Sequence, residues 1–540
     1  MVEKPHRGVI DVSDSHEENL ELLGYVIGEA SPVDFTFIVE EGKHPPRWEY
    51  VIVKSNEIVG DKEIQVDIVA QIYMIKSLSE ALNLGIGVDA ARKLIRAGLV
   101  DKRSIARARI LGFLYNGEIL QPRRAIHPSN EVYKAPPKIL EQFYSYSKDE
   151  GLHVGYLINR PDVPVSITVR GFRRHLAILG QTGAGKSYTT GVLIEELLKK
   201  GATIVILDPH ADYVFLSRKK DGSVFSKRIA VFRTRESTGR YSEEEIGKIE
   251  TYEVKFSDLT LDEIITVSGI QWNWSNIVEA LRKALEELRR KSKDYKLEDL
   301  IERLKKGDQH AVSVLKYVRR LEKLKVFGDT TTDIMNILKP KHVSIMDLSG
   351  LDDAVADYIA YRILNDIFNA TKTQQYKYPV FVFIEEAHRF IPSKENTLSK
   401  RIIKRIAAEG RKFGVFLVVI SQRPHKIDPD VLSQCNSQII LKMTNPEDQT
   451  AVRRSSERMS EDLLSDLPGL NTGEAVIVGE IVKAPVMVKI RLRETKEGGA
   501  DIVIVSKLKK ANRVAEEEEK SRMKKIKEEK KLIKDIVEEG

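Results

Sequence analysis

Apolar residues in the first 135 positions form short runs that alternate with polar residues, which is typical of β-strands. Gly, Pro, Asn and Lys gather between the runs, as expected for turns. The runs cover residues 24–27, 33–39, 50–53, 64–70 and 107–114. Because short strands at even spacing favour a closed or two-layered sheet, we predict a small β-barrel or sandwich over residues 1–135, with helical sequence at 81–97.

A second pattern begins near residue 165, after a proline-containing stretch, residues 136–164, that we interpret as a linker. Apolar runs now alternate with helical segments. The run 202–208 is almost entirely apolar, as a parallel strand covered on both faces requires. Further strands are expected at residues 229–232, 343–348, 380–384, 415–420 and 438–443. The pattern predicts an α/β fold in which helices cover a parallel sheet.

A polar helical block interrupts this alternation. Apolar residues recur every three or four positions in two segments, residues 277–288 and residues 312–321. We therefore predict a helical insertion over residues 245–330, which divides the α/β core into residues 165–244 and residues 331–500.

Composition narrows the class of protein. Hydrophobic residues make up 42% of the chain and charged residues 31%, which suits a soluble globular protein of several domains. The net charge of +7 is too small to indicate a nucleic-acid partner, so such a site must come from local clustering. The single cysteine, Cys435, excludes an internal disulfide and favours a reducing compartment. Few Cys beside many Lys, Glu and Ile residues fit a thermophile.

The two ends of the chain are polar. No apolar run approaches the ~18 residues of a membrane span, and residues 1–8 do not resemble a signal peptide. We therefore expect a cytoplasmic protein without a membrane partner. The tail, residues 501–540, is rich in Lys and Glu; it is a solvated helix, a disordered arm or a basic segment that binds a partner.

The strongest chemical signal is G-Q-T-G-A-G-K-S at residues 180–187, which lies between an apolar strand and a helical segment. Its glycines let the main chain curl until N–H groups face the β-phosphate, and the helix N-terminus adds partial positive charge. Lys186 is expected to bridge the β- and γ-phosphates, and the Ser187 hydroxyl to bind Mg²⁺. The expected nucleotide-binding residues here are Gly180, Gln181, Thr182, Gly183, Ala184, Gly185, Lys186, Ser187 and Tyr188. The sequence thus predicts a RecA-like P-loop ATPase core with ATP and Mg²⁺ as cofactors.

Two adjacent carboxylates, Glu385 and Glu386, follow the apolar strand at 380–384. At the end of a parallel strand beside the P-loop, Glu385 can hold the hydration shell of Mg²⁺, and Glu386 can polarise the attacking water. A doubled acid suits hydrolysis better than transfer to a small-molecule acceptor.

Asp208 and Gln422 follow two other expected strands. They fall at the carboxyl edge, where the sites of open α/β sheets gather. The amide of Gln422 can sense the γ-phosphate or orient water. Taken singly, each residue is equally well explained as the end of a strand.

The chain thus carries five separated motifs: G-Q-T-G-A-G-K-S, L-D-P-H-A-D-Y, F-I-E-E-A-H-R-F, A-E-G-R-K-F-G and S-Q-R-P. Together they resemble the HerA family, archaeal relatives of the FtsK DNA pumps, and the N-terminal β-domain is similar to that family's HAS barrel. The resemblance implies a homohexameric ring that hydrolyses ATP to move double-stranded DNA through its centre, with a NurA-type nuclease as partner in end resection. It gives Lys186, Asp208 and Glu386 catalytic roles. Ala211 stands where FtsK-like pumps more often have glycine, which affects only local loop geometry.

The resemblance also implies roles for two arginines. Arg411 corresponds to an arginine finger that reaches a neighbour's ATP, and Arg174, just ahead of the P-loop strand, to an arginine that contacts nucleotide. Independently, residues 396–411 have the pattern of an amphipathic helix whose end would project Arg411 and Lys412 outward, where a guanidinium can meet transition-state charge. The alternative is a cation that stabilises a helix C-terminus.

Basic residues gather soon after the acidic pair. They are Arg389, Lys394, Lys400, Arg401 and Lys404. A loop that moves with the ATP site is where a pump would contact DNA phosphates without sequence preference. The alternative is a solvated basic helix face.

The sequence and the resemblance together predict an ATP hydrolase that acts as a DNA translocase or helicase in double-strand break repair. Two alternatives stay open. One is an ATP-dependent ring scaffold that recruits a nuclease, and the other is a peripheral conjugation or secretion ATPase.

Overall fold

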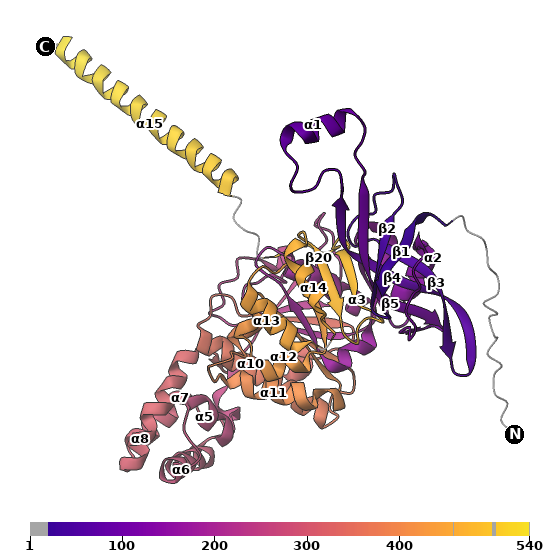
Figure 1. Cartoon of the computed structure of the whole chain (residues 1–540). Coiled ribbons are helices and arrows are strands. Elements are labelled where there is room, and N and C mark those ends of the chain that lie inside the picture. Colours follow the sequence, from indigo (N-terminus) through magenta and orange to yellow (C-terminus); the bar gives the residue numbers. More distant parts are fainter. Residues whose placement is uncertain (1–19, 457, 499–503, 539–540) are drawn as a thin grey trace.

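The computed structural model describes residues 20–456, 458–498 and 504–538. Figure 1 shows a β-barrel beside a larger α/β body, from which a lobe of helices extends. The expectation for the polar N-terminal residues 1–8 lies outside the described residues.

The N-terminal strands form a closed barrel, as the sequence predicts. The strand order β2-β1-β7-β3-β4-β5 closes because β5 also pairs with β2, and β6 extends from β5. Alternating apolar residues such as Phe37, Val51 and Ile68 fill the interior. Closure leaves the six ring strands without a free edge. The strands are β1 (Leu22–Ala30), β2 (Asp34–Val39), β3 (Tyr50–Val59), β4 (Lys62–Leu78), β5 (Arg103–Tyr115), β6 (Glu118–Leu120) and β7 (Glu131–Lys134). Between β4 and β5 stands the helix α1 (Val88–Arg96), within the expected helical sequence.

The body is built on one mixed sheet with the order β13-β12-β16-β11-β17-β18-β10-β19-β20-β21-β8-β9. Neighbouring strands are parallel from β13 to β19 and antiparallel from β19 to β9. The strands are β8 (Gly151–Leu157), β9 (Arg160–Thr168), β10 (Leu176–Leu179), β11 (Thr203–Asp208), β12 (Ile229–Arg233), β13 (Lys248–Thr251), β16 (His342–Asp347), β17 (Val380–Ile384), β18 (Val415–Ser421), β19 (Ser437–Leu441), β20 (Glu474–Val478) and β21 (Val486–Ile490).

Apolar residues on both faces of the parallel strands explain their continuous apolar runs. In β11, Val205 and Leu207 contribute to the core that includes α10, whereas Ile204 and Ile206 contribute to the core that includes α3. The helices of the body are α3 (Lys186–Lys199), α4 (Glu243–Ile246), α9 (Ile334–Ile337), α10 (Asp353–Lys372), α11 (Leu398–Glu409), α12 (Pro429–Gln434), α13 (Pro446–Ser455) and α14 (Glu461–Asp466).

The interpretation of residues 136–164 as a linker is wrong. This stretch contains the helix α2 (Pro137–Tyr144), the strand β8 and the start of β9, and β8 pairs with β21 at the far end of the chain. Pro161 and Pro164 argue against a central strand, but β9 lies at the edge of the sheet, where proline is tolerated.

The helical insertion exists but begins later than residue 245. β13 pairs with β12 in the main sheet, and the short parallel pair β14 (Val254–Lys255) and β15 (Phe327–Gly328) joins the two ends of the insertion. The helices between them are α5 (Leu261–Ser268), α6 (Ser275–Lys291), α7 (Leu297–Lys305) and α8 (Gln309–Val318). Figure 1 shows them as the lobe that extends from the body.

Asp466, at the end of α14, joins the body to the barrel. Its side chain is fully buried, with one oxygen 3.0 Å from Arg109 Nη2 and the other paired with Arg47. Both arginines belong to the barrel region, so positive charges of the barrel pair with a buried carboxylate of the body.

The tail contains α15 (Ile504–Glu538), whose side chains at residues 508–526 are exposed. None of the helices in the described parts of the chain is both long and apolar enough to cross a membrane.

Candidate nucleotide-binding site

The P-loop joins the carboxyl end of β10 to the start of α3. Gly183 and Gly185 have φ values of 75° and 101°, which favour glycine. A Cβ at Gly180 would lie 2.9 Å from the Cβ of Leu441, so this position also has no room for a side chain. The loop therefore depends on its glycines for both conformation and space.

Lys186 is buried at the first turn of α3, and its Nζ donates a hydrogen bond to the carbonyl of Gln181 at 3.2 Å. Burial lowers the pKa of Lys186, and the nearby charges of Glu385 and Glu386 oppose this shift. The ammonium group thus lies inside the loop and faces carboxylates.

Gln422 connects the P-loop to the acidic strand. β18 lies between β10 and β17, and Gln422 follows β18 directly. Its amide nitrogen donates to Glu386 Oε1 at 2.9 Å, and its amide oxygen accepts from the Thr182 hydroxyl. These three residues, each expected at the site, therefore form one chain of hydrogen bonds.

Glu386 is the more ionised member of the acidic pair. Its backbone is left-handed, with φ 48°, and its Oε2 lies 3.2 Å from His388 Nδ1. Burial raises the pKa of Glu386, but the contact with His388 and the charges of Lys186 and His210 together lower it, and the net pKa lies below the ordinary value. A carboxylate in this state can accept a proton.

Glu385 has the opposite surroundings. It is 2% exposed, and Oε2 accepts a hydrogen bond from the Tyr213 hydroxyl at 2.6 Å. Burial raises the pKa of Glu385 to about 8. Adjacent carboxyl groups whose pKa values move apart are the usual mark of divided roles.

Asp208 shapes the loop that follows β11. It is fully buried, and its oxygens accept hydrogen bonds from the backbone N–H groups of Asp212 at 3.0 Å and Tyr213 at 2.9 Å. Burial, helped by the charge of Asp212, raises the pKa of Asp208 to about 7.

Asp212 is a site residue that the sequence reasoning missed. Its Oδ2 accepts a hydrogen bond from Ser187 Oγ at 3.1 Å, so it touches the expected Mg²⁺ ligand. Burial raises the pKa of Asp212, although the bond from Ser187 acts in the other direction. The available signal was its place in L-D-P-H-A-D-Y, four residues after Asp208.

The donor set fits Mg²⁺. Ser187, Asp212 and Glu385 offer oxygen atoms, which Mg²⁺ prefers. No group of three or more His, Cys, Asp or Glu residues suited to a metal occurs in the described part of the chain. Mg²⁺ needs only one or two carboxylates when substrate phosphates and water complete its shell, so the site suits the metal together with a nucleotide.

Arg174 and Arg411 lie together at the opposite edge of the sheet, before the first residues of β10 and β18. The four-residue strand β10 separates Arg174 from the P-loop by about 13 Å. Arg174 pairs with Glu480 at 3.4 Å, and Arg411 is exposed. The cleft that they share, which we call the basic cleft, has a volume of about 470 Å³. Its lining residues are Arg170, Gly171, Arg173, Arg174, Arg411, Lys412 and Glu480.

The five basic residues after the acidic pair do not form one surface. Lys400 is buried and donates hydrogen bonds to the carbonyls of Pro392 at 2.7 Å and Glu395 at 3.1 Å. Arg389 pairs with Asp353 at 2.5 Å, and Lys404 with Asp430 at 2.7 Å.

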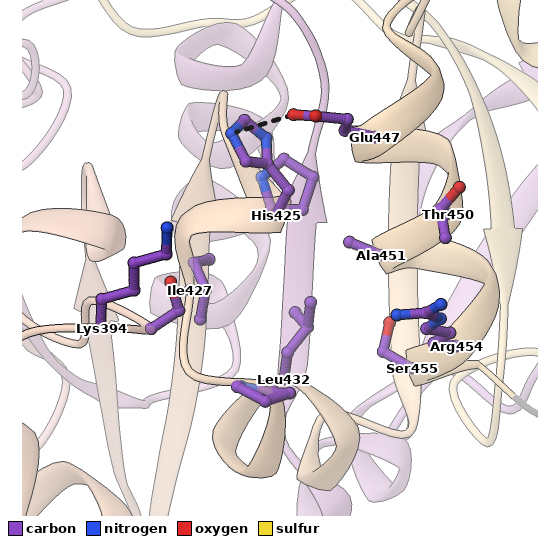
Figure 2. Close-up of a pocket in the computed structure, with 12 residues that line it drawn as sticks. Lys394, His425, Ile427, Leu432, Glu447, Thr450, Ala451, Arg454 and Ser455 are labelled. Carbon is purple, nitrogen blue, oxygen red and sulfur yellow. Dashed lines mark ion pairs between the residues drawn. The ribbon is translucent and has the colours of Figure 1, made fainter.

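Two of these five residues, Lys394 and Arg401, are exposed. Lys394 lines a groove of about 540 Å³ beside α12 and α13 (Figure 2). Arg401 lies on α11. These side chains are the ones that the fold leaves at the surface of this region.

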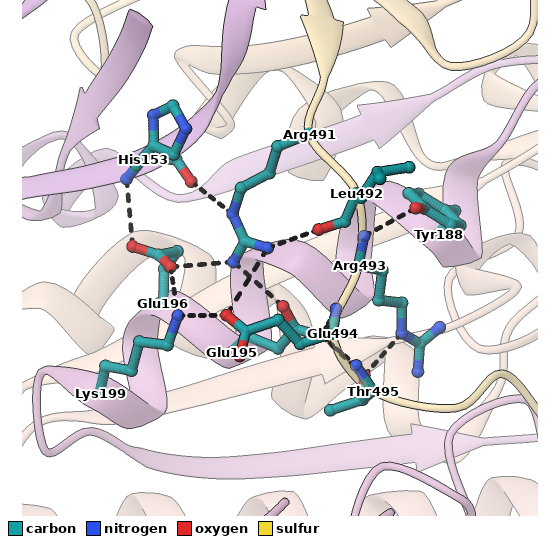
Figure 3. Close-up of polar contacts among 10 residues, drawn as sticks. All are labelled: His153, Tyr188, Glu195, Glu196, Lys199, Arg491, Leu492, Arg493, Glu494 and Thr495. Atoms are coloured by element: carbon teal, nitrogen blue, oxygen red, sulfur yellow. Dashed lines mark hydrogen bonds and ion pairs between the residues drawn. The ribbon is translucent and has the colours of Figure 1, made fainter. Parts of the chain in front are cut away.

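Tyr188 points toward the C-terminal part of the body. Its hydroxyl accepts a hydrogen bond from the backbone N–H of Arg493 at 2.6 Å (Figure 3). The P-loop helix is thus in contact with the segment that follows β21.

A parallel sheet with a P-loop on one strand and a paired acid two strands away defines a P-loop ATPase. The family described as "Helicase HerA, central domain" matches residues 152–367, and the AAA family of ATPases matches residues 331–443.

Two relatives named "DNA double-strand break repair helicase HerA" are similar over most of their length. The Pyrococcus furiosus protein is 30% identical over 91% of this chain and 98% of its own. The Sulfurisphaera tokodaii protein is 33% identical over 74% of this chain and 81% of its own. Among solved structures, VirB4 of Thermoanaerobacter pseudethanolicus matches 64% of this chain and 97% of its own at 18% identity, with a TM-score of 0.46. The chain belongs to the HerA family, and it is an ATP-hydrolysing enzyme.

Proposed function

We propose that this protein is an ATP-driven translocase of double-stranded DNA that acts in the repair of double-strand breaks. Two relatives that are similar to it over most of the chain carry the name of a double-strand break repair helicase. We further propose that it works as a homohexamer and with a NurA-type nuclease in the resection of DNA ends.

The observation that carries the proposal is the hydrogen-bonded chain of Thr182, Gln422 and Glu386 beside the buried Lys186. In the proposed reaction, the P-loop N–H groups and Lys186 bind the β- and γ-phosphates. Glu386 accepts a proton from the attacking water, because its low pKa keeps it ionised. Gln422, which is hydrogen-bonded to Thr182 of the P-loop and to Glu386, couples the binding of the γ-phosphate to the position of Glu386. Bound Mg²⁺, held through Ser187 and the carboxylates behind it, would neutralise phosphate charge.

We place the second half of the active site on a neighbouring subunit. The basic cleft offers Arg411 and Arg174 at the sheet edge opposite the P-loop, too far away to serve the ATP of their own chain. A ring that joins one subunit's P-loop edge to the next subunit's basic cleft would bring a guanidinium to the γ-phosphate. Asp208 is proposed to act by holding the loop that carries Asp212.

For DNA contact we propose Lys394 and Arg401. They keep exposed charges, whereas Arg389, Lys400 and Lys404 hold carboxylates or carbonyls of their own chain. Removing a side chain that binds a DNA phosphate should make duplex affinity less dependent on salt, with the slope falling by roughly one for each such residue.

The test is displacement of a protein block from duplex DNA. We expect displacement in one direction that requires ATP hydrolysis and is lost in Lys186→Ala. Combined Lys394→Ala and Arg401→Ala should weaken duplex binding and lower its salt slope by about two, while Lys404→Ala, the matched control, should keep the slope. Nuclease recruitment without hydrolysis-dependent displacement would instead identify a ring scaffold.

A further inference from the structure

The segment after β21, residues 491–498, crosses α3 and is anchored there by a buried carboxylate. We call this segment the strap (Figure 3). Glu195 Oε1 accepts hydrogen bonds from the backbone N–H groups of Glu494 at 2.9 Å and Thr495 at 2.8 Å, and from the Thr495 hydroxyl at 2.8 Å. Arg491 Nη2 lies 3.0 Å from Glu195 Oε2. The strap is therefore fixed along the helix that begins at the P-loop.

Within the strap, the Arg493 side chain is 2% exposed and reaches the first turn of α3. Its Nε donates to the Thr495 hydroxyl at 2.7 Å, Nη2 to the Lys496 carbonyl at 3.2 Å and Nη1 to the Ser187 carbonyl at 3.5 Å. Among the residues that the structure describes, no carboxylate oxygen lies within 4.0 Å of the Arg493 guanidinium nitrogens, so Arg493 forms no ion pair there. A buried cation without an ion pair is costly, so its position needs a reason beyond stability.

The helix makes room for this guanidinium with a glycine. A Cβ at Gly191 would lie 2.4 Å from Arg493 Nε and 2.5 Å from Cζ. Gly191 lies inside α3, where glycine lowers helix stability and alanine would raise it. The sequence therefore keeps a weak helix former at a position that the Arg493 side chain covers.

Both ends of Ser187 are held by residues outside the P-loop. Asp212 accepts the hydroxyl hydrogen bond, Arg493 contacts the carbonyl, and the Arg493 backbone also donates to the hydroxyl of Tyr188. Asp212 thus holds the Ser187 hydroxyl, while Arg493 contacts the backbone of Ser187 and the side chain of Tyr188 in the first turn of α3.

We propose that Arg493 is a positioning residue of the ATP site, which sets Ser187 and Tyr188 in the first turn of α3 for binding Mg²⁺ and nucleotide. This inference rests on the proposed function of Ser187 as the P-loop ligand of Mg²⁺. It makes the strap a working part of the nucleotide site. Residues that orient a metal ligand typically change metal affinity or activity 10–100-fold when they are removed.

The experiment compares Arg493→Ala, Gly191→Ala and the double variant in the full-length protein. The measurement is the Mg²⁺ concentration that gives the half-maximal effect, determined both from ATP hydrolysis and from equilibrium binding of a fluorescent ATP analogue without turnover. Each single variant should raise that concentration by about 10-fold. Gly191→Ala acts by displacing the guanidinium from α3, since its Cβ would lie 2.4 Å from Arg493 Nε, so it should match Arg493→Ala without removing any polar group. The double variant should be no worse than either single one.

The matched control is Lys199→Ala, which removes the exposed ion pairs of Lys199 with Glu196 and Glu494 at the other end of α3. It should leave the Mg²⁺ dependence unchanged, and thermal melting should show that all variants fold. If Arg493→Ala does not fold, Gly191→Ala alone still decides, because alanine suits the helix.

Unchanged Mg²⁺ dependence in folded Arg493→Ala and Gly191→Ala would overturn the positioning role. So would a double variant whose defect equals the product of the two single defects. A different result would show that the proposed nucleotide site is wrong. In that case Lys186→Ala would hydrolyse ATP as fast as the unaltered protein, whatever the Arg493 variants do.

Discussion

At the scale of single residues, the surroundings of each carboxyl group decide what it can do. Glu385 and Glu386 are neighbours in sequence, yet burial raises the pKa of the first, while His388, Lys186 and His210 together bring the pKa of the second below the ordinary value. The left-handed backbone at Glu386 turns consecutive side chains toward different partners, Tyr213 for Glu385 and Gln422 for Glu386. One residue is thus held deep inside the fold by Tyr213, and the other is an ionised carboxylate beside Gln422.

Glu386→Gln should retain ATP binding and lose hydrolysis, by about 10² to 10⁴-fold if the carboxylate is the general base. Equilibrium binding of a fluorescent ATP analogue and steady-state turnover measure the two properties separately. Glu385→Gln is the neighbouring comparison, and it should keep more activity because a neutral amide can still accept from Tyr213. Normal hydrolysis by Glu386→Gln with loss in Glu385→Gln would reverse the assignment of the pair.

At the scale of elements, the site depends on three strands that meet at one edge. β10 brings the P-loop, β17 the acidic pair and β18 Gln422, and their order in the sheet places the amide between the other two. At the opposite edge of the sheet, His175, which precedes β10, contacts both α11 and β18. Its Nε2 donates to the Ala407 carbonyl of α11 at 3.0 Å, and its Nδ1 accepts from the Leu417 N–H of β18 at 3.0 Å.

His175 should make the protein less stable as the pH falls from 7 to 5. Burial, with help from the charge of Arg411, lowers the pKa of His175 to about 4, below its ordinary value near 6.5. Between these values the unfolded chain binds more protons than the folded one, so stability falls with falling pH, by up to about 1.4 kcal/mol for each pH unit.

The midpoint temperature of unfolding, measured at several pH values, tests this. The variant His175→Asn should show a smaller loss of stability between pH 7 and pH 5 than the unaltered protein. Asn is chosen because it carries no titrating group and its side-chain oxygen can accept from the Leu417 N–H in place of Nδ1. Parallel pH curves for the two proteins would contradict the prediction.

At the scale of the whole molecule, the two halves of the proposed active site face away from each other. The P-loop lies at the carboxyl edge of the parallel strands and the basic cleft at the amino edge. Within one subunit, Lys186 is already assigned to the β- and γ-phosphates, so we expect a second fixed positive charge for the γ-phosphate to come from a neighbouring subunit. An arginine finger is worth roughly 10³ to 10⁵ in rate.

Subunits with Arg411→Ala and subunits with Lys186→Ala should each be inactive alone and regain activity when mixed. Only interfaces that pair an intact P-loop with an intact Arg411 can hydrolyse ATP, so the recovered rate should depend on the mixing ratio. Turnover of mixed assemblies, with mass measurement to show that both kinds of subunit are present, provides the readout. Normal turnover by Arg411→Ala alone would exclude Arg411 as the finger.

The sequence by itself determined where most elements lie and which motif binds phosphate. The strands of the parallel sheet other than β13, the helices α6 and α8 and the P-loop were predictable because their information is local. These signals are local patterns: a continuous apolar run, a repeat every three or four residues, or a glycine pattern. Each one predicts the conformation of the residues in which it occurs. The strands β8 and β9 were missed because their evidence is a distant partner, β21, and an edge that tolerates proline.

Only the tertiary structure decided how the side chains divide the work. It showed that Asp212 contacts Ser187, that Lys400 is enclosed by carbonyl groups, and that the basic cleft lies at the far edge of the sheet. Burial, pKa and hydrogen bonding depend on which distant segments pack around a residue. Residue type and spacing do not contain that information, so two adjacent glutamates look alike in the sequence and differ in the fold.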